Sequence, residues 1–301
     1  MKDKRLIGAL RVQSVALAEI RETFRKKGLV EIMPVILSTT SDPLGPDPGS
    51  NIIGKPIIEY QGQNLVLTQS MILHKQIMAA SGLERFFTVS PNVRLESPKS
   101  QHSGVHLFEF SQVDFELAHA GMKDVFDLIE DTVTATITRV KKDCSEEMAI
   151  WGRELRVPKK FEIHSTDQLI ERYGADWEKL ASEEATDPFW VLNHKREFYD
   201  AEDQETPGSY RNYDLLYPEG FGEGLSGGER EWEYERIRMR IERDGLSLEE
   251  YKPYLEYAKA GFVPSAGAGL GVERFTRFLV GASHIGEIQA FRRVPGEDVI
   301  I

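Results

Sequence analysis

FFTVSPNVRLESPKSQHSGVHLFEFSQVDFEL, residues 86–117, is the segment on which the predicted fold depends. Two β-rich runs, at 85–96 and 106–117, lie on either side of the polar segment SPKSQHSGV. This pattern predicts an antiparallel hairpin with a long connection. Arg94 and Glu96 are two residues apart, so on a strand they point to the same face.

The returning run of this hairpin carries polar and aromatic side chains on the same spacing. Phe110, Gln112, Asp114 and Glu116 share one face of the predicted strand. A face that combines an arginine, several carboxylates and a ring suits a bound anion and a planar ring better than it suits an apolar core. A solvated hairpin with ordinary cross-strand ion pairs explains the same spacing, so the spacing alone leaves both interpretations open.

These residues also resemble a known family. V-R-L-E followed by H-L-F-E-F-S-Q-V-D-F-E is similar to motif 2 of the class II aminoacyl-tRNA synthetases, in particular the aspartyl/asparaginyl branch. The resemblance implies that Arg94 binds the α-phosphate of ATP, that Glu96 reads the adenine amino group and that Phe110 stacks on the adenine. It also brings His106 to the ATP site and Gln112 to the substrate. A guanidinium fork matches phosphate oxygens, and a carboxylate accepts from an exocyclic amine.

The whole chain has the composition of a globular protein. It has 301 residues, of which 41% are hydrophobic and 10% aromatic, and we treat 1–301 as a single domain. The one cysteine, Cys144, excludes an intramolecular disulfide and suits a reducing cytoplasm, where we expect the protein. No apolar run is long enough to span a membrane. The net charge of −12 argues against a nucleic-acid partner, which calls for a basic footprint.

The N-terminal region predicts a helix at 9–27, ending at Gly28, and then the β-rich run LVEIMPVIL with its embedded Pro34. This combination resembles motif 1, the dimer element of the family, so we expect a homodimer through residues 9–37. An ordinary helix–strand pair is the alternative explanation.

A long loop and a strand–helix unit follow. The segment 38–56 is rich in Pro, Gly, Ser and Asp, and the resemblance places there an acidic residue for the α-amino group of the substrate, with Asp42 and Asp47 both open. NLVLTQSMILHKQIMAASGL, 64–83, resembles the aspartyl L-x-Q-S-P-Q-x-x-K-Q segment. The resemblance implies that Ser70 and Lys75 contact the substrate, Lys75 through a carboxylate. A surface helix lysine is the alternative.

The middle of the chain carries little predicted chemistry. A helix is predicted from 121 to about 142, a strand and a helix over 161–174, and two strands over 187–199. His164 and His194 are single histidines without metal-ligand spacing, so we interpret them as structural. Cys144 has no activating base nearby in the sequence and is interpreted in the same way.

NYDLLYPEGFGEGLSGGER, 212–230, is similar to an archaeal aspartyl pattern in which a strand ends in L-E-I-x-S-G-x-x-R. The resemblance implies that Glu223 and Ser226 hold the Mg²⁺ that bridges the ATP phosphates, and that Arg230 binds the substrate carboxylate. Oxygen ligands together with phosphates are what Mg²⁺ prefers. A glycine-rich turn with a solvated arginine is the alternative.

After helices at about 231–243 and 247–260, SAGAGLGVERFTRFLVGA contains the run G-A-G-L-G. A dinucleotide loop is one explanation of such glycines, but the βαβ unit and ribose-binding acid are missing. G-x-G-L-G-x-E-R entering a helix instead resembles class II motif 3. The resemblance implies that Gly269 and Gly271 lie against the adenine and that Arg274 binds the γ-phosphate. Arg94 and Arg274 are therefore the catalytic candidates.

The three motifs predict an α+β fold, the class II aminoacyl-tRNA synthetase catalytic domain, with a mostly antiparallel sheet flanked by helices. Motif 1 begins within about ten residues of Met1, so we expect no anticodon-binding barrel. The chain then resembles the asparagine synthetases related to this family, which use ATP and Mg²⁺ to join aspartate and ammonia. We expect a β-aspartyl adenylate, with the α-carboxylate held by Lys75, Asp114 and Arg230, and neither a nucleic-acid nor a membrane partner.

Two alternatives remain. One is an adenylate-forming enzyme that transfers an amino acid to tRNA or to a protein. The other is a non-catalytic subunit that only binds an amino acid or a nucleotide. The complete set Arg94, Glu96, Glu223 and Arg274 speaks against the second, because a silent subunit has no physical need for a triphosphate site.

Overall fold

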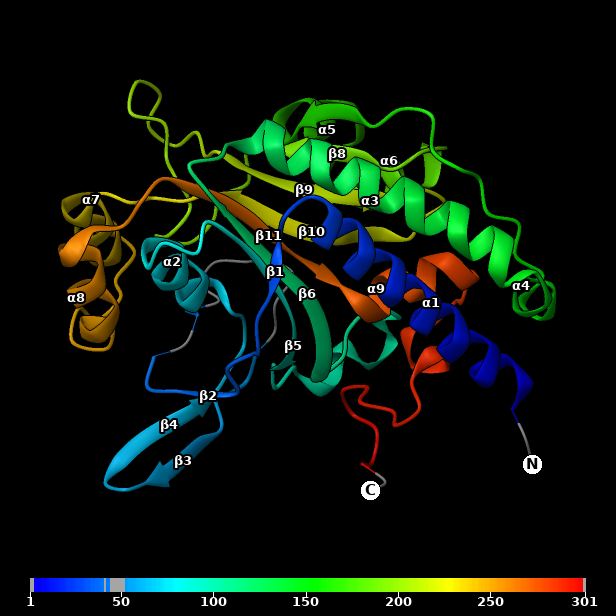
Figure 1. Ribbon diagram of the computed structural model, residues 1–301, viewed down its shortest axis with the longest axis horizontal. Helices are drawn as coiled ribbons and strands as arrows, with labels where there is room; N and C mark the ends of the chain where they lie inside the picture. The colour runs from blue at the N-terminus through cyan, green and yellow to red at the C-terminus, as the bar shows by residue number, and fades with distance from the viewer. Residues whose placement is uncertain (1–2, 41, 44–51, 300–301) are drawn as a thin grey trace.

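The computed structural model describes residues 3–40, 42–43 and 52–299, and within these residues eight strands form one large sheet (Figure 1). The strands are β1 (Val30–Glu31), β5 (Arg85–Val93), β6 (Glu109–Ala118), β7 (Glu162–Ser165), β8 (Phe189–Leu192), β9 (Asn212–Tyr217), β10 (Gly222–Glu229) and β11 (Ser265–Gly271). Their order across the sheet is β1-β5-β6-β11-β10-β9-β8-β7. The two edge strands pair in parallel with their neighbours, and all the other pairs are antiparallel. The predicted class of sheet is confirmed.

The hairpin predicted from segment 86–117 is present as β5 and β6, with Arg85 opposite Leu117 and Val93 opposite Glu109. Its connection contains a 3₁₀ helix, η1 (Pro98–Ser103), whose first turn is capped by the Ser97 hydroxyl accepting from the Lys99 amide. The pairing stops at Val93, so Arg94 and Glu96 lie just beyond the strand and not on it.

The sheet has one apolar face and one polar face, because successive residues of a strand point in opposite directions. In β6, Val113, Phe115 and Leu117 are at most 1% exposed and lie in the main core. Asp114 and Glu116 point to the opposite side, where they meet charged partners. The predicted polar face of the hairpin is therefore real.

Helices cover the apolar face. They are α1 (Lys4–Lys26), α3 (Met122–Asp143), α4 (Ser145–Trp151) and α9 (Val272–Val280), and Figure 1 shows α1 and α3 crossing the sheet. Asp3 caps α1 by accepting from the Leu6 amide. Phe24 of this helix packs edge-on against Phe87 and Phe115, with ring centroids 5.2 and 5.4 Å away. These contacts fix the N-terminal helix on the hairpin.

The remaining elements surround the polar face and its two ends. Helices α2 (Ile72–Ala80), α7 (Tyr234–Arg243) and α8 (Lys252–Gly261) share a second apolar cluster, and α5 (Thr166–Tyr173), η2 (Gly174–Asp176) and α6 (Trp177–Glu184) pack beside β8. The short helix η3 (Ile285–Ile288) precedes the C-terminal segment. A small sheet of β2 (Leu37–Ser38), β4 (Gln63–Leu67) and β3 (Ile57–Tyr60) projects from the body at the lower left of Figure 1.

Several predicted elements differ from the structure, and the first is the N-terminal helix, predicted at 9–27 and observed as α1 from Lys4 to Lys26. The run 29–37 forms two short strands, β1 and β2, on either side of Pro34, which has no amide hydrogen for a ladder bond. The segment 187–199 supplies one strand, β8, because Asn193 follows it with a φ of +68° and turns the chain away. The helix predicted from 247 begins only at Lys252. No helix among the described residues is both long and apolar enough to cross a membrane.

Candidate functional site

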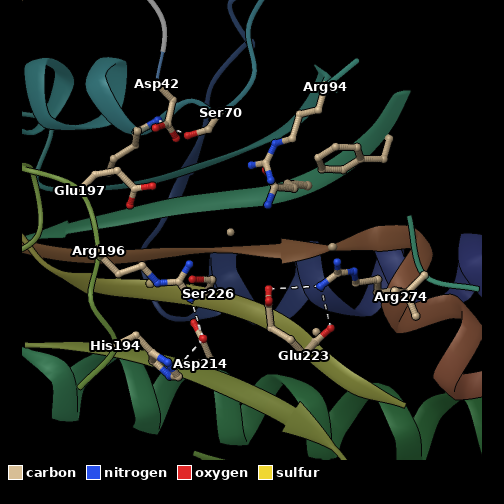
Figure 2. A pocket seen from close by; sticks show the side chains of 18 of the residues that line it. Asp42, Ser70, Arg94, His194, Arg196, Glu197, Asp214, Glu223, Ser226 and Arg274 are labelled. Carbon is tan, nitrogen blue, oxygen red and sulfur yellow. Dashed lines mark hydrogen bonds and ion pairs between the residues drawn. The ribbon is translucent and has the colours of Figure 1, made fainter. Parts of the chain in front are cut away.

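A cavity of about 570 Å³ opens on the polar face of the sheet, and it is lined by those site residues predicted from the sequence that the structure describes. Figure 2 shows this cavity, with Arg94 on one wall and Glu223 and Arg274 on the opposite wall. The predicted residues found at the cavity are Ser70, Lys75, Arg94, Glu96, His106, Phe110, Gln112, Asp114, Glu223, Ser226, Arg230, Gly269, Gly271 and Arg274. The fold therefore brings residues from motif 2, motif 3 and the intervening segments to one place.

Two arginines mark one end of the cavity. The Arg94 Nε donates to the Gln69 carbonyl at 3.1 Å, and its guanidinium lies 5.2 Å from the centre of the Phe110 ring. Arg274, at the start of α9, donates to the Glu223 carbonyl at 3.1 Å and lies 3.3 Å from the carboxylate of the same residue. Two guanidinium groups and a ring face suit a nucleotide with its phosphates.

Strand β11 forms a floor of backbone at this end. Gly269 and Gly271 line the cavity, and Gly267 lies against Glu116, while Ala266, Ala268 and Leu270 are buried in the core. A Cβ atom at Gly269 would come within 2.8 Å of the Gln112 amide nitrogen. The glycine thus leaves room for the Gln112 side chain, and it lets a ligand approach the strand backbone.

Glu223 and Ser226 reach the cavity together because β10 contains a bulge. Three residues apart, they would point to opposite faces of a regular strand. The pairing with β9 shifts between Glu223 and Leu225, which inserts Gly224 as an extra residue and returns both side chains to one face. A Cβ atom at Gly224 would lie 2.0 Å from the Tyr217 ring, so this bulge requires glycine.

This carboxylate–hydroxyl pair fits a Mg²⁺ ion that is shared with a nucleotide. Among the described residues, no group of three or more His, Cys, Asp or Glu side chains is arranged to hold a metal. Mg²⁺ usually takes one or two protein carboxylates and completes its shell with phosphate oxygens and water. Glu223 and Ser226 can supply the protein share of such a shell.

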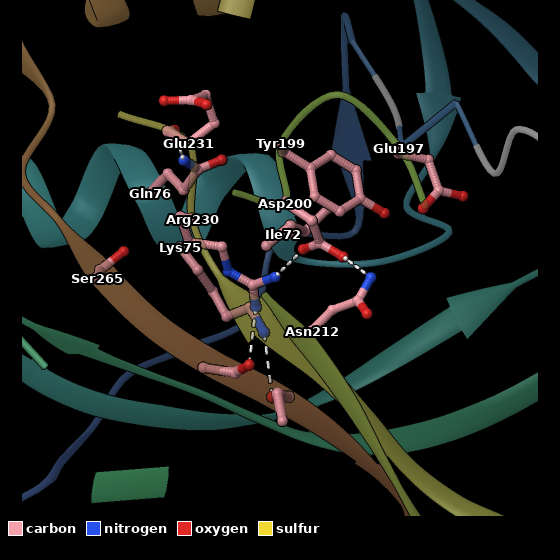
Figure 3. Close-up of polar contacts among 12 residues, drawn as sticks. Ile72, Lys75, Gln76, Glu197, Tyr199, Asp200, Asn212, Arg230, Glu231 and Ser265 are labelled. Carbon is pink, nitrogen blue, oxygen red and sulfur yellow. Dashed lines mark hydrogen bonds and ion pairs between the residues drawn. The ribbon is translucent and has the colours of Figure 1, made fainter. Parts of the chain in front are cut away.

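The other end of the cavity contains a buried ion pair between α2 and β6 (Figure 3 shows Lys75). The Lys75 Nζ lies 2.9 Å from Asp114 Oδ1 and donates to the Ala268 carbonyl at 3.1 Å. Ser90 donates to the second Asp114 oxygen at 2.6 Å. Lys75 is 2% exposed and already well bonded, so it is not the surface lysine of the alternative explanation.

Arg230 completes this end with a second buried network (Figure 3). Its guanidinium binds Glu116 at 3.1 and 3.4 Å, Asp200 at 2.8 Å and the Gly267 carbonyl at 2.9 Å. Burial alone would lower the pKa of Arg230, but the charges of Glu116 and Asp200 outweigh burial and raise that pKa. Arg230 therefore stays charged inside the protein.

In the buried ion pairs at this end, two cations, Lys75 and Arg230, bind three carboxylates, Asp114, Glu116 and Asp200, and the charges of Arg196 and Arg240 also act on Asp200. The cations predicted to clamp a substrate carboxylate are thus already neutralised by the protein. The side-chain carboxylate of a substrate would meet more negative than positive charge in these ion pairs. A neutral amide would meet donors and acceptors side by side.

Sequence reasoning missed a polar cluster on the wall formed by β9 and the segment after β8. Asp214 lies 2.7 Å from Arg196 and 3.2 Å from the His194 Nε2 (Figure 2). Asp214 on β9 lies directly opposite Ser226 on β10. Because Ser226 was predicted as a site residue, its neighbour on the adjacent strand was a candidate as well. His194 was interpreted as structural because it has no metal-ligand spacing, but it lines the cavity.

A further acidic pair, of which Glu197 was missed, lies near α2. Asp42 and Glu197 line the cavity, and the Tyr199 hydroxyl donates to Asp42 at 3.2 Å. Asp42 was one of two residues left open in the loop 38–56, and the other, Asp47, lies outside the described residues. Glu197 gave no signal in the sequence, because it lies in a segment predicted as a strand.

Comparisons with known proteins agree with this geometry. The fold is that of a class II aminoacyl-tRNA synthetase catalytic domain, as expected from the three motifs. The family model described as tRNA synthetases class II (D, K and N) matches residues 1–295, so the chain belongs to that family.

The relatives of this chain include asparagine–tRNA and aspartate–tRNA ligases. The chain is 28% identical to the asparagine–tRNA ligase of Thermococcus gammatolerans, over 98% of this chain and 71% of the relative. It is 29% identical to the aspartate–tRNA(Asp/Asn) ligase of Methanopyrus kandleri, over 94% and 67%. The crystal structure of asparaginyl-tRNA synthetase from Pyrococcus horikoshii with asparaginyl-adenylate superimposes with a TM-score of 0.86 at 27% identity, covering 98% of this chain and 70% of the other.

These relatives overturn two expectations. The resemblance to ammonia-dependent asparagine synthetases, with aspartate and ammonia as substrates, is wrong, since the relatives named above are tRNA ligases. The expectation of no nucleic-acid partner is contradicted by the same finding. Its physical weakness is that a net charge of −12 describes the whole chain and says nothing about a local contact surface.

Proposed function

We propose that this protein activates asparagine with ATP, forming asparaginyl adenylate and pyrophosphate, and transfers the asparaginyl group to tRNA. The observation that carries the proposal is the division of one cavity into an end with two arginines and an aromatic ring, which suit a nucleotide, and an end whose cations are ion-paired by buried carboxylates. Arg94 and Arg274 serve the phosphates, and the network around Lys75 and Arg230 serves an uncharged side chain. The family and the relatives described above support the same chemistry.

In the first step, an α-carboxylate oxygen of asparagine attacks the α-phosphorus of ATP. The bond from that phosphorus to the bridging oxygen breaks, and pyrophosphate leaves with the electron pair. Arg94 stabilises the negative charge that builds up on the α-phosphate, Phe110 stacks on the adenine and Glu96 accepts from its amino group. Mg²⁺ held by Glu223 and Ser226 would neutralise phosphate charge when bound, and Arg274 binds the γ-phosphate.

In the second step, a ribose hydroxyl at the tRNA end attacks the carbonyl carbon of the adenylate. The new ester bond forms as AMP leaves, and the hydroxyl proton passes to solvent or to an AMP oxygen. The protein's own contribution is to hold the carbonyl between the two ends of the cavity and to limit hydrolysis by water.

The neutralised end explains why asparagine fits better than aspartate. An amide donates through its nitrogen and accepts through its oxygen, and the buried network presents carboxylates and cations side by side. A β-carboxylate would bring a fourth negative charge to two cations, with a large electrostatic cost in a buried site. We therefore expect discrimination by charge and not by size, since the two side chains are nearly isosteric.

The test is ATP–pyrophosphate exchange with each of the standard amino acids. We expect exchange with asparagine, and a kcat/KM for aspartate at least tenfold lower, because one uncompensated charge costs more than the ~1.4 kcal/mol that a factor of ten represents. Arg94→Ala protein prepared in the same way measures any contaminating synthetase from the expression host. Exchange with aspartate and not with asparagine would reject the proposed substrate.

Transfer is measured separately with radioactive asparagine and total tRNA. We expect acid-precipitable, base-labile radioactivity that depends on ATP. Intact exchange without any charged tRNA would reject the transfer step while leaving adenylate formation standing.

A further inference from the structure

The turn that joins β9 to β10, residues 218–221, has a backbone that needs support from outside. Glu219 has a φ of +62° and Gly220 a φ of +78°. For Glu219 this left-handed conformation is costly, and it persists only where surrounding contacts hold it. Glu223 follows two residues after the turn, so the contacts that hold the turn also decide where the Glu223 carboxylate lies.

Arg274 on helix α9 makes one contact with the strand that begins here. Its guanidinium donates to the Glu223 carbonyl at 3.1 Å and lies 3.3 Å from the Glu223 carboxylate (Figure 2). In the proposed reaction Arg274 binds the γ-phosphate and the Glu223 carboxylate binds Mg²⁺, so this side-chain contact is given up when ATP binds. Another contact must then keep the turn on the helix.

Arg277 lies one turn further along α9 and makes such a contact. Its Nη1 donates to the Phe221 carbonyl at 3.3 Å, and its Nη2 donates to the Ser283 carbonyl at 3.4 Å. Its Cζ lies 4.8 Å from the centre of the Phe221 ring, within the range of a cation–π interaction. Arg277 is not among the residues that line the cavity, so ATP does not compete for its donors.

Arg153, from the segment after α4, holds the same turn. Its guanidinium donates to the two Glu219 carboxylate oxygens at 2.5 and 3.0 Å, and its Cζ lies 5.4 Å from the centre of the Phe221 ring and 5.5 Å from that of Phe278. A Cβ atom at Gly281 would come within 2.8 Å of the Arg153 Cδ, so the glycine that ends α9 leaves room for this side chain. Arg153 therefore contacts both the turn and α9.

Packing alone does not explain these two arginines. The Nε atoms of Arg153 and Arg277 are buried and have no hydrogen-bond partner among the described residues, which costs stability. Burial first, and then the charge of Arg274, lower the pKa of Arg277, while Glu287 acts in the opposite direction. What arginine offers in return is a planar fork that binds carbonyl oxygens while its face packs on a ring.

We propose that Arg277, together with Arg153, is a positioning residue that holds the β9–β10 turn against α9 while ATP is bound. It thereby keeps Glu223 and Arg274 at the spacing that the triphosphate needs. This inference rests on the proposed function in one respect, since it takes ATP as the ligand. Because both arginines act through Glu223, their loss should affect ATP and leave asparagine almost unaffected.

The first test compares Arg277→Met with the wild type in ATP–pyrophosphate exchange. Displacing a reactive group by about 1 Å costs up to about 100-fold in rate, so we expect the kcat/KM for ATP to fall about 10-fold to 100-fold. The KM for asparagine should change less than about twofold, because Lys75 and Asp114 lie on other elements. Arg238→Met is the matched control, since Arg238 is a partly exposed helix arginine on α7, and it should match the wild type.

The second test is calorimetric binding of a non-hydrolysable ATP analogue with magnesium, which depends on neither the amino acid nor tRNA. The Kd should rise about 10-fold in Arg277→Met and by a smaller factor in Arg153→Met. Arg277→Lys keeps the charge but not the fork that reaches two carbonyls, so its Kd should resemble that of Arg277→Met. Thermal unfolding checks that each variant is folded, and Arg153→Met carries the test where Arg277→Met does not fold.

The outcomes separate the two proposals. Weaker binding of the analogue in the methionine variants and in Arg277→Lys supports the inference, even where the wild type shows no exchange with asparagine, which counts against the proposed function alone. A wild-type Kd in Arg277→Met overturns the inference while exchange stands. Wild-type binding by Arg277→Lys overturns it as well, because charge alone then suffices. Equal losses for ATP and asparagine would show a general structural role and also overturn it. Failure of the wild type to bind the analogue overturns both proposals.

Discussion

At the scale of single residues, Arg94 is the side chain whose removal should affect chemistry most and stability least. Its one hydrogen bond to a described residue is to the Gln69 carbonyl, so truncation leaves no buried charge unpaired. We expect Arg94→Ala to lower the rate of pyrophosphate exchange by about 10²–10³, the usual cost of removing one preorganised donor at a developing charge. The melting temperature should stay near that of the wild type. Near-normal exchange in this variant would show that Arg94 does not bind the α-phosphate.

Glu273, beside Arg274, should make stability depend on pH. Burial raises its pKa from 4.5 to about 7, although the Ser111 amide bonds its carboxylate at 3.0 and 3.1 Å. The native state therefore holds this proton more tightly than the unfolded state, and the free energy of unfolding falls as pH rises from about 4.5 to 7.

Glu273→Gln should remove this contribution. We expect the variant to match the wild type near the low end of that range and to melt at a higher temperature above it. Glu256→Gln, at an exposed position of α8, is the control and should follow the wild type throughout. Parallel curves for Glu273→Gln and the wild type across the whole range would contradict the expected ionisation.

The residues with a recognisable motif were predictable from the sequence, and those without one were not. Arg94, Glu223 and Arg274 lie in short segments where spacing and chemistry coincide. The neutralisation of Lys75 and Arg230 could not be predicted, because Asp114 and Glu116 on β6 and Asp200 after β8 reach them from other parts of the chain. These pairs join segments far apart in the chain, so no local pattern in the sequence indicates them.

At the scale of elements, the bulge in β10 decides whether the predicted metal ligands can act together. Gly224→Ala places a methyl group where it would overlap the Tyr217 ring, which is fully buried and stacks on Phe278 at 4.6 Å. We expect a loss of about 1–3 kcal/mol in stability from overpacking. We also expect a large fall in exchange rate, because Glu223 and Ser226 no longer share a face.

Gly54→Ala is the control for this element, since a Cβ atom there has no neighbour within 4 Å and the backbone angle is ordinary. It should change neither the melting temperature nor the exchange rate. A Gly224→Ala protein with normal exchange and normal magnesium dependence would show that the bulge is not needed for the metal ligands.

The sequence predicted the hairpin of β5 and β6 well because alternation of apolar and polar residues continues along both strands. It predicted the ends of elements less well. Arg94 and Glu96 lie beyond the last paired residue of β5. The bulge at Gly224 is not marked in the sequence, because several glycines lie close to it. The ends of elements depend on tertiary contacts such as that of Gly224 with Tyr217, which are invisible in a single sequence.

At the scale of the whole molecule, several apolar side chains of the segment between β1 and β2 are exposed. Val30, Met33, Ile36 and Leu37 are 40–86% exposed along the segment joining β1 to β2. Exposed apolar side chains that gather in one segment are typical of an interaction site. We expect a homodimer through residues 9–37, with a mass of twice 34.2 kDa by light scattering at micromolar concentration.

Met33→Asp should shift this assembly towards the monomer, because a buried interface does not accommodate an unpaired carboxylate. Met239→Asp is the matched control, since Met239 is a half-exposed methionine on α7, away from that segment. A wild-type mass near 34.2 kDa would contradict the predicted dimer.

The alternation along β6 also bears on how this protein can evolve. Phe115 and Leu117 contribute only apolar volume to the core, so other large hydrophobic residues can replace them with little loss of stability. Asp114 and Glu116 each neutralise a buried cation. Substitution by asparagine or glutamine would therefore leave a buried cation without its partner charge. In a saturation mutagenesis library of β6, positions that tolerate substitution should therefore alternate with positions that do not. Any change in the amino acid used would require paired substitutions across strands, which makes the specificity of this pocket slow to drift.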